Sequence, residues 1–168
     1  ELDISQNSIY DLTGLQRLTN LVVLNCSQNN ISALPFLPKL QNLICYKNNL
    51  KSLSQFKNFA MLHYLNISMN QLKNLEGIQF LSSLKTLICS QNQIENIQQL
   101  KYVQLDLLDV TNNLLTIDAI KESKMNVKIL KINGFEETNP ICKQIGYKQI
   151  VFDMVYVEEI DGLVRKQQ

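Results

Sequence analysis

The residues of this chain whose types could support chemistry are four cysteines, one histidine and three asparagine sequons. Cys26, Cys45 and Cys89 each follow a leucine at alternate spacing, which is typical of inward positions on neighbouring short strands. Parallel strands lie about 4.8 Å apart, which is wide for the Cβ separation of about 3.8 Å that a disulfide prefers. We therefore expect reduced thiols buried as small hydrophobic side chains, with Cys142 alone near the C-terminus. No cysteine spacing matches a zinc site.

Catalytic chemistry is not indicated by the remaining candidates. His63 is the only histidine, so neither a histidine-dependent triad nor a multi-histidine metal site can form; we expect a solvated surface residue, or alternatively a pH-sensing contact. The five glycines form no phosphate-binding loop. Asn25-Cys26-Ser27, Asn30-Ile31-Ser32 and Asn66-Ile67-Ser68 match glycosylation sequons, but the repeated phrase described below produces them. The sequence predicts no enzyme activity, cofactor or metal.

Composition limits the kinds of partner. The net charge of +1 gives no overall attraction to nucleic acid or to an acidic lipid surface. The longest apolar runs are far shorter than the roughly 20 residues that span a bilayer. The chain also starts inside a repeat at Glu1, without a capping element, and we therefore expect a fragment of a longer protein.

The elements that position these residues are repeats of one phrase. It reads LNCSQNNISAL from Leu24, LICYKNNLKSL from Leu43 and LNISMNQLKNL from Leu65. The phrase continues from Leu87 and Leu108, and a degraded copy opens the chain. The asparagines that close it are Asn7, Asn29, Asn48, Asn70, Asn92 and Asn113. A period of about 22 residues is typical of a solenoid.

Each phrase predicts a short strand followed by a turn. The inward pairs are Leu24/Cys26, Leu43/Cys45, Leu65/Ile67, Leu87/Cys89 and Leu108/Val110. The closing asparagine carries an amide that both donates and accepts, and we expect these amides to form a buried ladder against backbone groups. Apolar residues three apart in the second half of most repeats favour 3₁₀ turns. Pro35 and Pro38 predict an extended segment between Asn29 and Asn48, and residues 119–125 an α-helical turn.

The pattern L-x-x-L-x-L-x-x-N-x-L/I resembles the leucine-rich-repeat consensus. The phrase Leu75-Glu76-Gly77-Ile78-Gln79-Phe80-Leu81 resembles the short subclass seen in the protein phosphatase-1 regulatory subunit. The resemblance implies an α/β fold: a right-handed leucine-rich-repeat solenoid with a parallel β-sheet on its concave side and 3₁₀ or short helical turns on its convex side. Residues 1–134 would form the repeats, with about seven strands of which the first is truncated, and residues 135–168 a C-terminal cap.

The tail resembles a C-terminal leucine-rich-repeat cap. Residues 127–133 predict a last strand, after which Phe135 would stand at the asparagine position. The cap positions are Asn139-Pro140, Tyr147-Lys148, Val151, Val155, Val157 and Ile160-Asp161-Gly162. Similar caps occur in the spliceosomal A-prime protein and in many axonemal proteins. Lys148 and Met154-Val155 depart from the arginine and the Leu-Pro pair that are usual there.

Function is expected on the outward side of the strands, where Tyr46 and Lys47 interrupt a consensus series of serine and threonine. Apolar side chains that the core does not need surround them, and exposed apolar surface usually marks an interface. The candidate partner-binding residues are Val23, Asn25, Ile44, Tyr46, Lys47, Tyr64, Asn66, Met69, Ile88, Leu107 and Asp109. Seven strands would span about 29 Å, enough for one helix or the edge of a small domain. Alternatively, these side chains pack against one another, or the rest of the chain covers them.

The sequence therefore predicts a non-catalytic scaffold that binds a partner protein through its concave face. Mixed charges on that face disfavour direct nucleic-acid binding, and no membrane or metal partner is expected. The resemblance implies an intracellular, cytoplasmic setting: an axonemal (ciliary) or cytoskeletal complex, a phosphatase-regulatory complex, or a ribonucleoprotein. The alternative functions are a module that recruits substrates to a catalytic domain elsewhere in the protein, and a purely structural unit.

Overall fold

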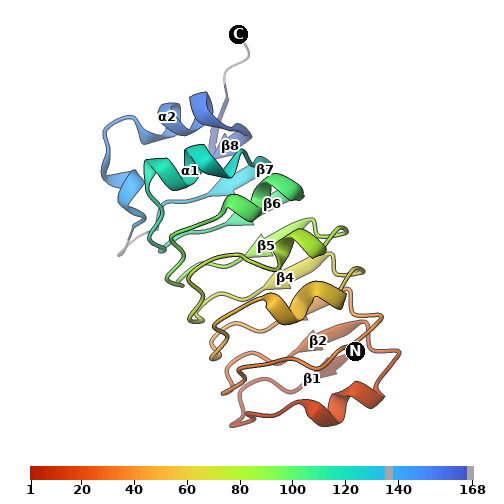
Figure 1. The fold of residues 1–168 in the computed structure, drawn as a ribbon. Helices are drawn as coiled ribbons and strands as arrows, with labels where there is room; N and C mark the ends of the chain where they lie inside the picture. Colours follow the sequence, from red (N-terminus) through yellow and green to blue (C-terminus); the bar gives the residue numbers. More distant parts are fainter. Residues whose placement is uncertain (135–137, 166–168) are drawn as a thin grey trace.

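The computed structural model describes residues 1–134 and 138–165, and these residues form one sheet of nine strands in chain order (Figure 1). The strands are β1 (Leu2–Asp3), β2 (Val23–Asn25), β3 (Asn42–Ile44), β4 (Tyr64–Asn66), β5 (Thr86–Ile88), β6 (Gln104–Asp109), β7 (Asn126–Lys131), β8 (Tyr156–Ile160) and β9 (Leu163–Val164). Strands β1 to β8 pair in parallel, and β9 turns back antiparallel to β8. The two termini lie at opposite ends of the stack.

Helical turns connect the strands along the other side of the stack (Figure 1). They are η1 (Thr13–Arg17), η2 (Ser54–Asn58), η3 (Ile78–Phe80), η4 (Gln98–Tyr102), α1 (Ile117–Ser123), η5 (Pro140–Lys143) and α2 (Tyr147–Met154). The predicted 3₁₀ turns are confirmed, and the proline segment between β2 and β3 is extended, as predicted. Helix α1 begins two residues earlier than residues 119–125 because the Thr116 hydroxyl accepts a hydrogen bond from the Ala119 amide.

The core lies between the sheet and the helical turns. All ten predicted inward strand residues, from Leu24/Cys26 to Leu108/Val110, are fully buried. A hydrogen bond with the Cys26 thiol, together with burial, raises the pKa of Cys45. Burial and the nearby Asp109 carboxylate raise the pKa of Cys89. Both thiols therefore behave as the neutral, small hydrophobic side chains that the pattern predicted.

The asparagine ladder joins each repeat to the one before it. The Asn70 amide donates to the carbonyl oxygens of Ile67 and Ser68 in its own repeat, at 3.0 and 3.1 Å. The same amide reaches back to the Cys45 carbonyl at 3.0 Å, and its oxygen accepts the Leu50 N–H at 2.9 Å. Asparagines 29, 48, 92 and 113 repeat this pattern. The predicted ladder is confirmed, although Asn92 is only partly buried and Asn7, at the open end, is exposed.

The residue before each closing asparagine adopts a left-handed backbone conformation. These residues are Gln6, Gln28, Lys47, Met69, Gln91 and Asn112, with φ between 52° and 56°. Each strand must turn sharply here to bring the following asparagine amide over its own carbonyl groups. None of the six is glycine, so each repeat carries the steric cost of a side chain at positive φ.

The C-terminal cap continues the ladder with other residues. The prediction that Phe135 takes the asparagine position falls outside the described residues. The ladder role belongs instead to Asn139, whose oxygen accepts the Leu115 N–H at 2.9 Å. Its amide donates to the carbonyl oxygens of Val110 and Ile132 at 2.8 and 2.7 Å. The pattern hid this residue because it stands more than one turn later than the consensus spacing.

Asp161 ends the ladder. One carboxylate oxygen accepts the Ile132 N–H at 2.9 Å, and the other accepts the Tyr147 hydroxyl at 2.8 Å. Burial, followed by this hydrogen bond, raises the pKa of Tyr147. Asp161 and Gly162, both at positive φ, form the two-residue turn that reverses the chain into β9. Strands β8 and β9 lie within residues 138–165 and extend the sheet of the repeats.

Candidate functional site

The strand register brings the predicted outward residues into two rows on the sheet face, the surface formed by the outward side chains of β2 to β7. The first row is Val23, Asn42, Tyr64, Thr86, Leu107 and Ile129. The second row is Asn25, Ile44, Asn66, Ile88, Asp109 and Lys131. Each residue is directly paired with its neighbours in the row, so this part of the candidate surface is continuous.

One apolar side chain stands on every strand of this face. We call this set the apolar stripe: Val23, Ile44, Tyr64, Ile88, Leu107 and Ile129. From β2 to β6 it alternates between the two rows, and from β6 to β7 it stays in the first row. All six side chains are partly buried, unlike the fully buried residues between them. Ile129 was not among the candidate residues, and only the register reveals that it prolongs the stripe.

Tyr46, Lys47 and Met69 lie at the end of the strands, where the chain turns. The Tyr46 hydroxyl accepts a hydrogen bond from the Gln28 side-chain amide at 3.0 Å, which fixes its ring beside the stripe. Lys47 and Met69 occupy left-handed turn positions in neighbouring repeats, and Met69 is 40% exposed. These three residues therefore form one rim of the sheet face.

Asn25, Asn66 and Asp109 use their side-chain oxygens inside the molecule. The Asn66 oxygen accepts both the backbone N–H and the hydroxyl of Ser68, at 3.1 and 2.9 Å. Asn25 bonds its second neighbour in the same way, and so does Asp109. This local turn explains two of the three sequons, because it needs a hydroxyl two residues after the asparagine. The three side chains are committed to backbone geometry at least as much as to a partner.

Charges at the start of the strands compensate one another toward the C-terminal end. Lys128 and Asp106 form an ion pair of 2.7 Å, which lowers the pKa of Asp106 and raises that of Lys128. Lys85 acts on Asp106 from the other side, and Glu158 acts on Lys128. Such an alternating row gives no field that would favour a phosphate backbone.

The preceding repeats are different in charge. Residues 12–105 contain eight basic and two acidic residues, a formal charge of +6. On the outward rows and turns of β2 to β5 the charged residues are Lys47 and Lys85, and both are exposed. His63, also exposed, precedes β4 on the same side, as predicted for a solvated residue.

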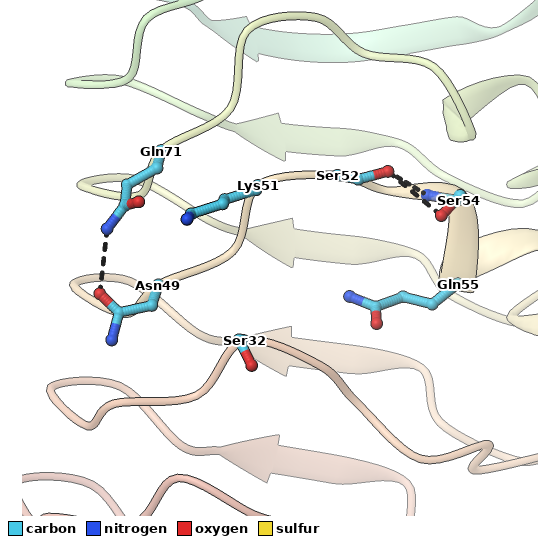
Figure 2. Close-up of a pocket in the computed structure, with 7 residues that line it drawn as sticks. All are labelled: Ser32, Asn49, Lys51, Ser52, Ser54, Gln55 and Gln71. Carbon is cyan, nitrogen blue, oxygen red and sulfur yellow. Dashed lines mark hydrogen bonds between the residues drawn. The ribbon is translucent and has the colours of Figure 1, made fainter.

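A hollow of about 400 Å³ on the flank of the solenoid offers no catalytic arrangement (Figure 2). Its lining is polar: Ser32, Asn49, Lys51, Ser52, Ser54, Gln55 and Gln71. The Gln71 amide donates to the Asn49 side-chain oxygen at 3.1 Å, and the serines bond each other. Over residues 1–134 and 138–165 there is also no group of three or more histidine, cysteine, aspartate or glutamate side chains placed to hold a metal ion.

Comparison with known proteins supports the fold. No protein-family model and no curated protein matches the chain. Among solved structures, an internalin (inlF) from Listeria monocytogenes matches with a TM-score of 0.61 and 19% sequence identity, covering 99% of this chain and 54% of the internalin chain. The chain thus spans about half the length of that structure. The predicted fold class, a leucine-rich-repeat solenoid with a parallel sheet, is confirmed; at this identity the likeness shows the fold alone.

No helix within the described part of the chain is long and apolar enough to cross a membrane.

Proposed function

We propose that this solenoid is a non-catalytic scaffold that binds a partner protein through its sheet face. The observation that carries the proposal is the apolar stripe. The inward residues already form a complete core, so the stripe is not needed for folding. Contiguous apolar surface outside the core usually marks an interface, and tyrosine, which the stripe and its rim both contain, is enriched where binding energy concentrates.

The arrangement of the stripe argues against side chains that merely pack against one another. In the first row Asn42 separates Val23 from Tyr64, and Thr86 separates Tyr64 from Leu107. Polar residues therefore interrupt the lateral apolar contacts that would shield a row from water. A partner that bridges the two rows would bury all six side chains at once.

The setting that we propose is cytoplasmic, in an axonemal, cytoskeletal or phosphatase-regulatory complex. Its support is the resemblance of the cap motif around Asn139-Pro140 and Tyr147-Lys148. Fluorescence microscopy of the tagged full-length protein tests this setting, and a signal confined to the cell exterior would contradict it.

The binding proposal is tested by combining Tyr46→Ala with Tyr64→Ala in a pull-down from cell extract. Partner recovery should fall at least five-fold, because two aromatic contacts are removed. A matched control combines Phe80→Ala with Tyr102→Ala, which removes two aromatic side chains, 51% and 65% exposed, from the helical-turn side. Equal recovery by the folded wild-type protein and the Tyr46/Tyr64 variant would contradict the proposal.

A further inference from the structure

We infer that the element received by the sheet face is an amphipathic α-helix of about 16 residues whose polar side is acidic, lying along the apolar stripe. The inference rests on the proposed function, since it specifies what the same face binds. Three features of the face carry it: the length of the stripe, its spacing and the surrounding charge.

The length of the stripe fits a helix of four to five turns. Its six side chains stand on six successive strands, and five gaps of about 4.8 Å give a length of about 24 Å. An α-helix rises 1.5 Å per residue, so about 16 residues cover that distance. Helices of this length are common in globular proteins.

The spacing of the stripe favours a helix over an extended segment. A helix laid across the strands presents one apolar side chain per turn of 5.4 Å, close to the spacing of one stripe residue per strand. The mismatch reaches only about 3 Å over the whole stripe. An extended segment would place side chains of one face almost 7 Å apart and lose register within three strands.

Backbone hydrogen bonding points to the same conclusion. The backbone groups of β2 to β7 are already paired with neighbouring strands, so the face offers a partner side chains and not a free strand edge. A helix satisfies its own backbone hydrogen bonds and can lie on such a face, whereas an extended segment would leave its own unpaired.

Charge defines the polar side of the helix. Over β2 to β5 the face presents Lys47 and Lys85 and no carboxylate, within a region of formal charge +6. Lys85 also faces Asp106, but that carboxylate is already paired with Lys128. Glutamate or aspartate on the flanks of the helix would complement this potential, and lysine or arginine would oppose it.

The test uses three synthetic, fluorescently labelled 18-residue peptides and the full described chain. The first has leucine at i, i+3, i+4 and i+7 spacing with glutamate on the other side. The second replaces every glutamate with lysine, and the third places a proline at the centre of the first, which breaks its helix. Binding is measured by fluorescence anisotropy at low and at high salt.

We expect the glutamate peptide to bind at least ten-fold more tightly than either of the other two, with a loss of affinity at high salt. Lys85→Glu should weaken this binding at least five-fold. Lys57→Glu, the same charge change at an exposed position of η2, should weaken it less than two-fold. Equal binding of the lysine or proline peptide, or an unchanged affinity of Lys85→Glu, would overturn the inference.

The two proposals can fail separately. If none of the peptides binds, while recovery of the cellular partner still depends on Tyr46 and Tyr64, the helix inference is wrong and the proposed function stands. If recovery does not depend on these tyrosines either, both are wrong.

Discussion

At the scale of single residues, asparagine has two different structural roles in each repeat. The closing asparagine uses its donor and its acceptor at once, and no other side chain of that size can do both. The asparagine or aspartate on the strand, as at Asn66, uses only its oxygen to hold the following serine. The first role could be predicted from the repeat alone. The second could not, because strand position 66 looks outward in any repeat pattern.

The ladder has a measurable weight. Asn70→Ala should lower the free energy of unfolding by about 1–3 kcal/mol, because backbone groups of two repeats lose their partners in a buried place. Urea denaturation measures this change. Asn7→Ala is the matched control, since Asn7 is exposed and its amide donates only within its own turn. A change below half a kcal/mol for Asn70→Ala would contradict the role of the ladder.

At the scale of elements, the turn that ends each strand is the most constrained part of the repeat. Its left-handed residue precedes the ladder asparagine in six successive copies and is never a glycine. Sequence reasoning located the strands and the 3₁₀ turns, because these follow from apolar spacing. It missed the left-handed position, because glutamine, lysine and methionine give no hint of positive φ.

Substitution at Gln91 tests this turn, since Gln91 has a φ of 52° and is exposed. Gln91→Val should lower the free energy of unfolding by about 1–2 kcal/mol, because a β-branched side chain clashes in this conformation. Gln91→Asn should change it by less than half as much, because asparagine tolerates the left-handed region. Thermal unfolding of the two variants compares them directly, and equal melting temperatures would show that the turn is not strained.

At the scale of the whole molecule, the regular residues of the repeat account for the fold, and the departures from it point to the interface. The stripe could be predicted in part, because outward positions follow from the alternation of each strand. Its continuity over six strands depends on the register, which a sequence alone does not fix. The cap was harder, because Asn139 and Asp161 extend the ladder from positions outside the repeat spacing.

The buried thiols make the stability of the molecule depend on alkaline pH. The pKa values of Cys45 and Cys89 are raised in the folded chain, and burial raises that of Cys142 to about 12. The unfolded chain therefore loses these protons first, and the stability present below pH 9 is lost as the pH rises further. Each buried thiol should contribute a loss of about 1.4 kcal/mol per pH unit above its unfolded pKa.

Urea denaturation under reducing conditions at pH 8 and pH 10 measures this loss. Cys89→Val should lose about 1 kcal/mol less than the unsubstituted chain between these two values, because it has one titrating thiol fewer. The comparison between the two proteins cancels the titration of lysine and tyrosine, which both share. An identical loss would mean that Cys89 is not buried as a neutral thiol.

The account depends most on the claim that a partner contacts the sheet face and not the helical turns. Site-specific photo-crosslinking tests this claim directly, with p-benzoyl-phenylalanine placed at Ile88 in one protein and at Phe80 in another. Ile88 lies at the centre of the apolar stripe, and Phe80 lies at the end of η3 on the other side of the solenoid. We predict a crosslinked partner of defined mass from position 88 and none from position 80. Crosslinking from position 80 alone would contradict the account.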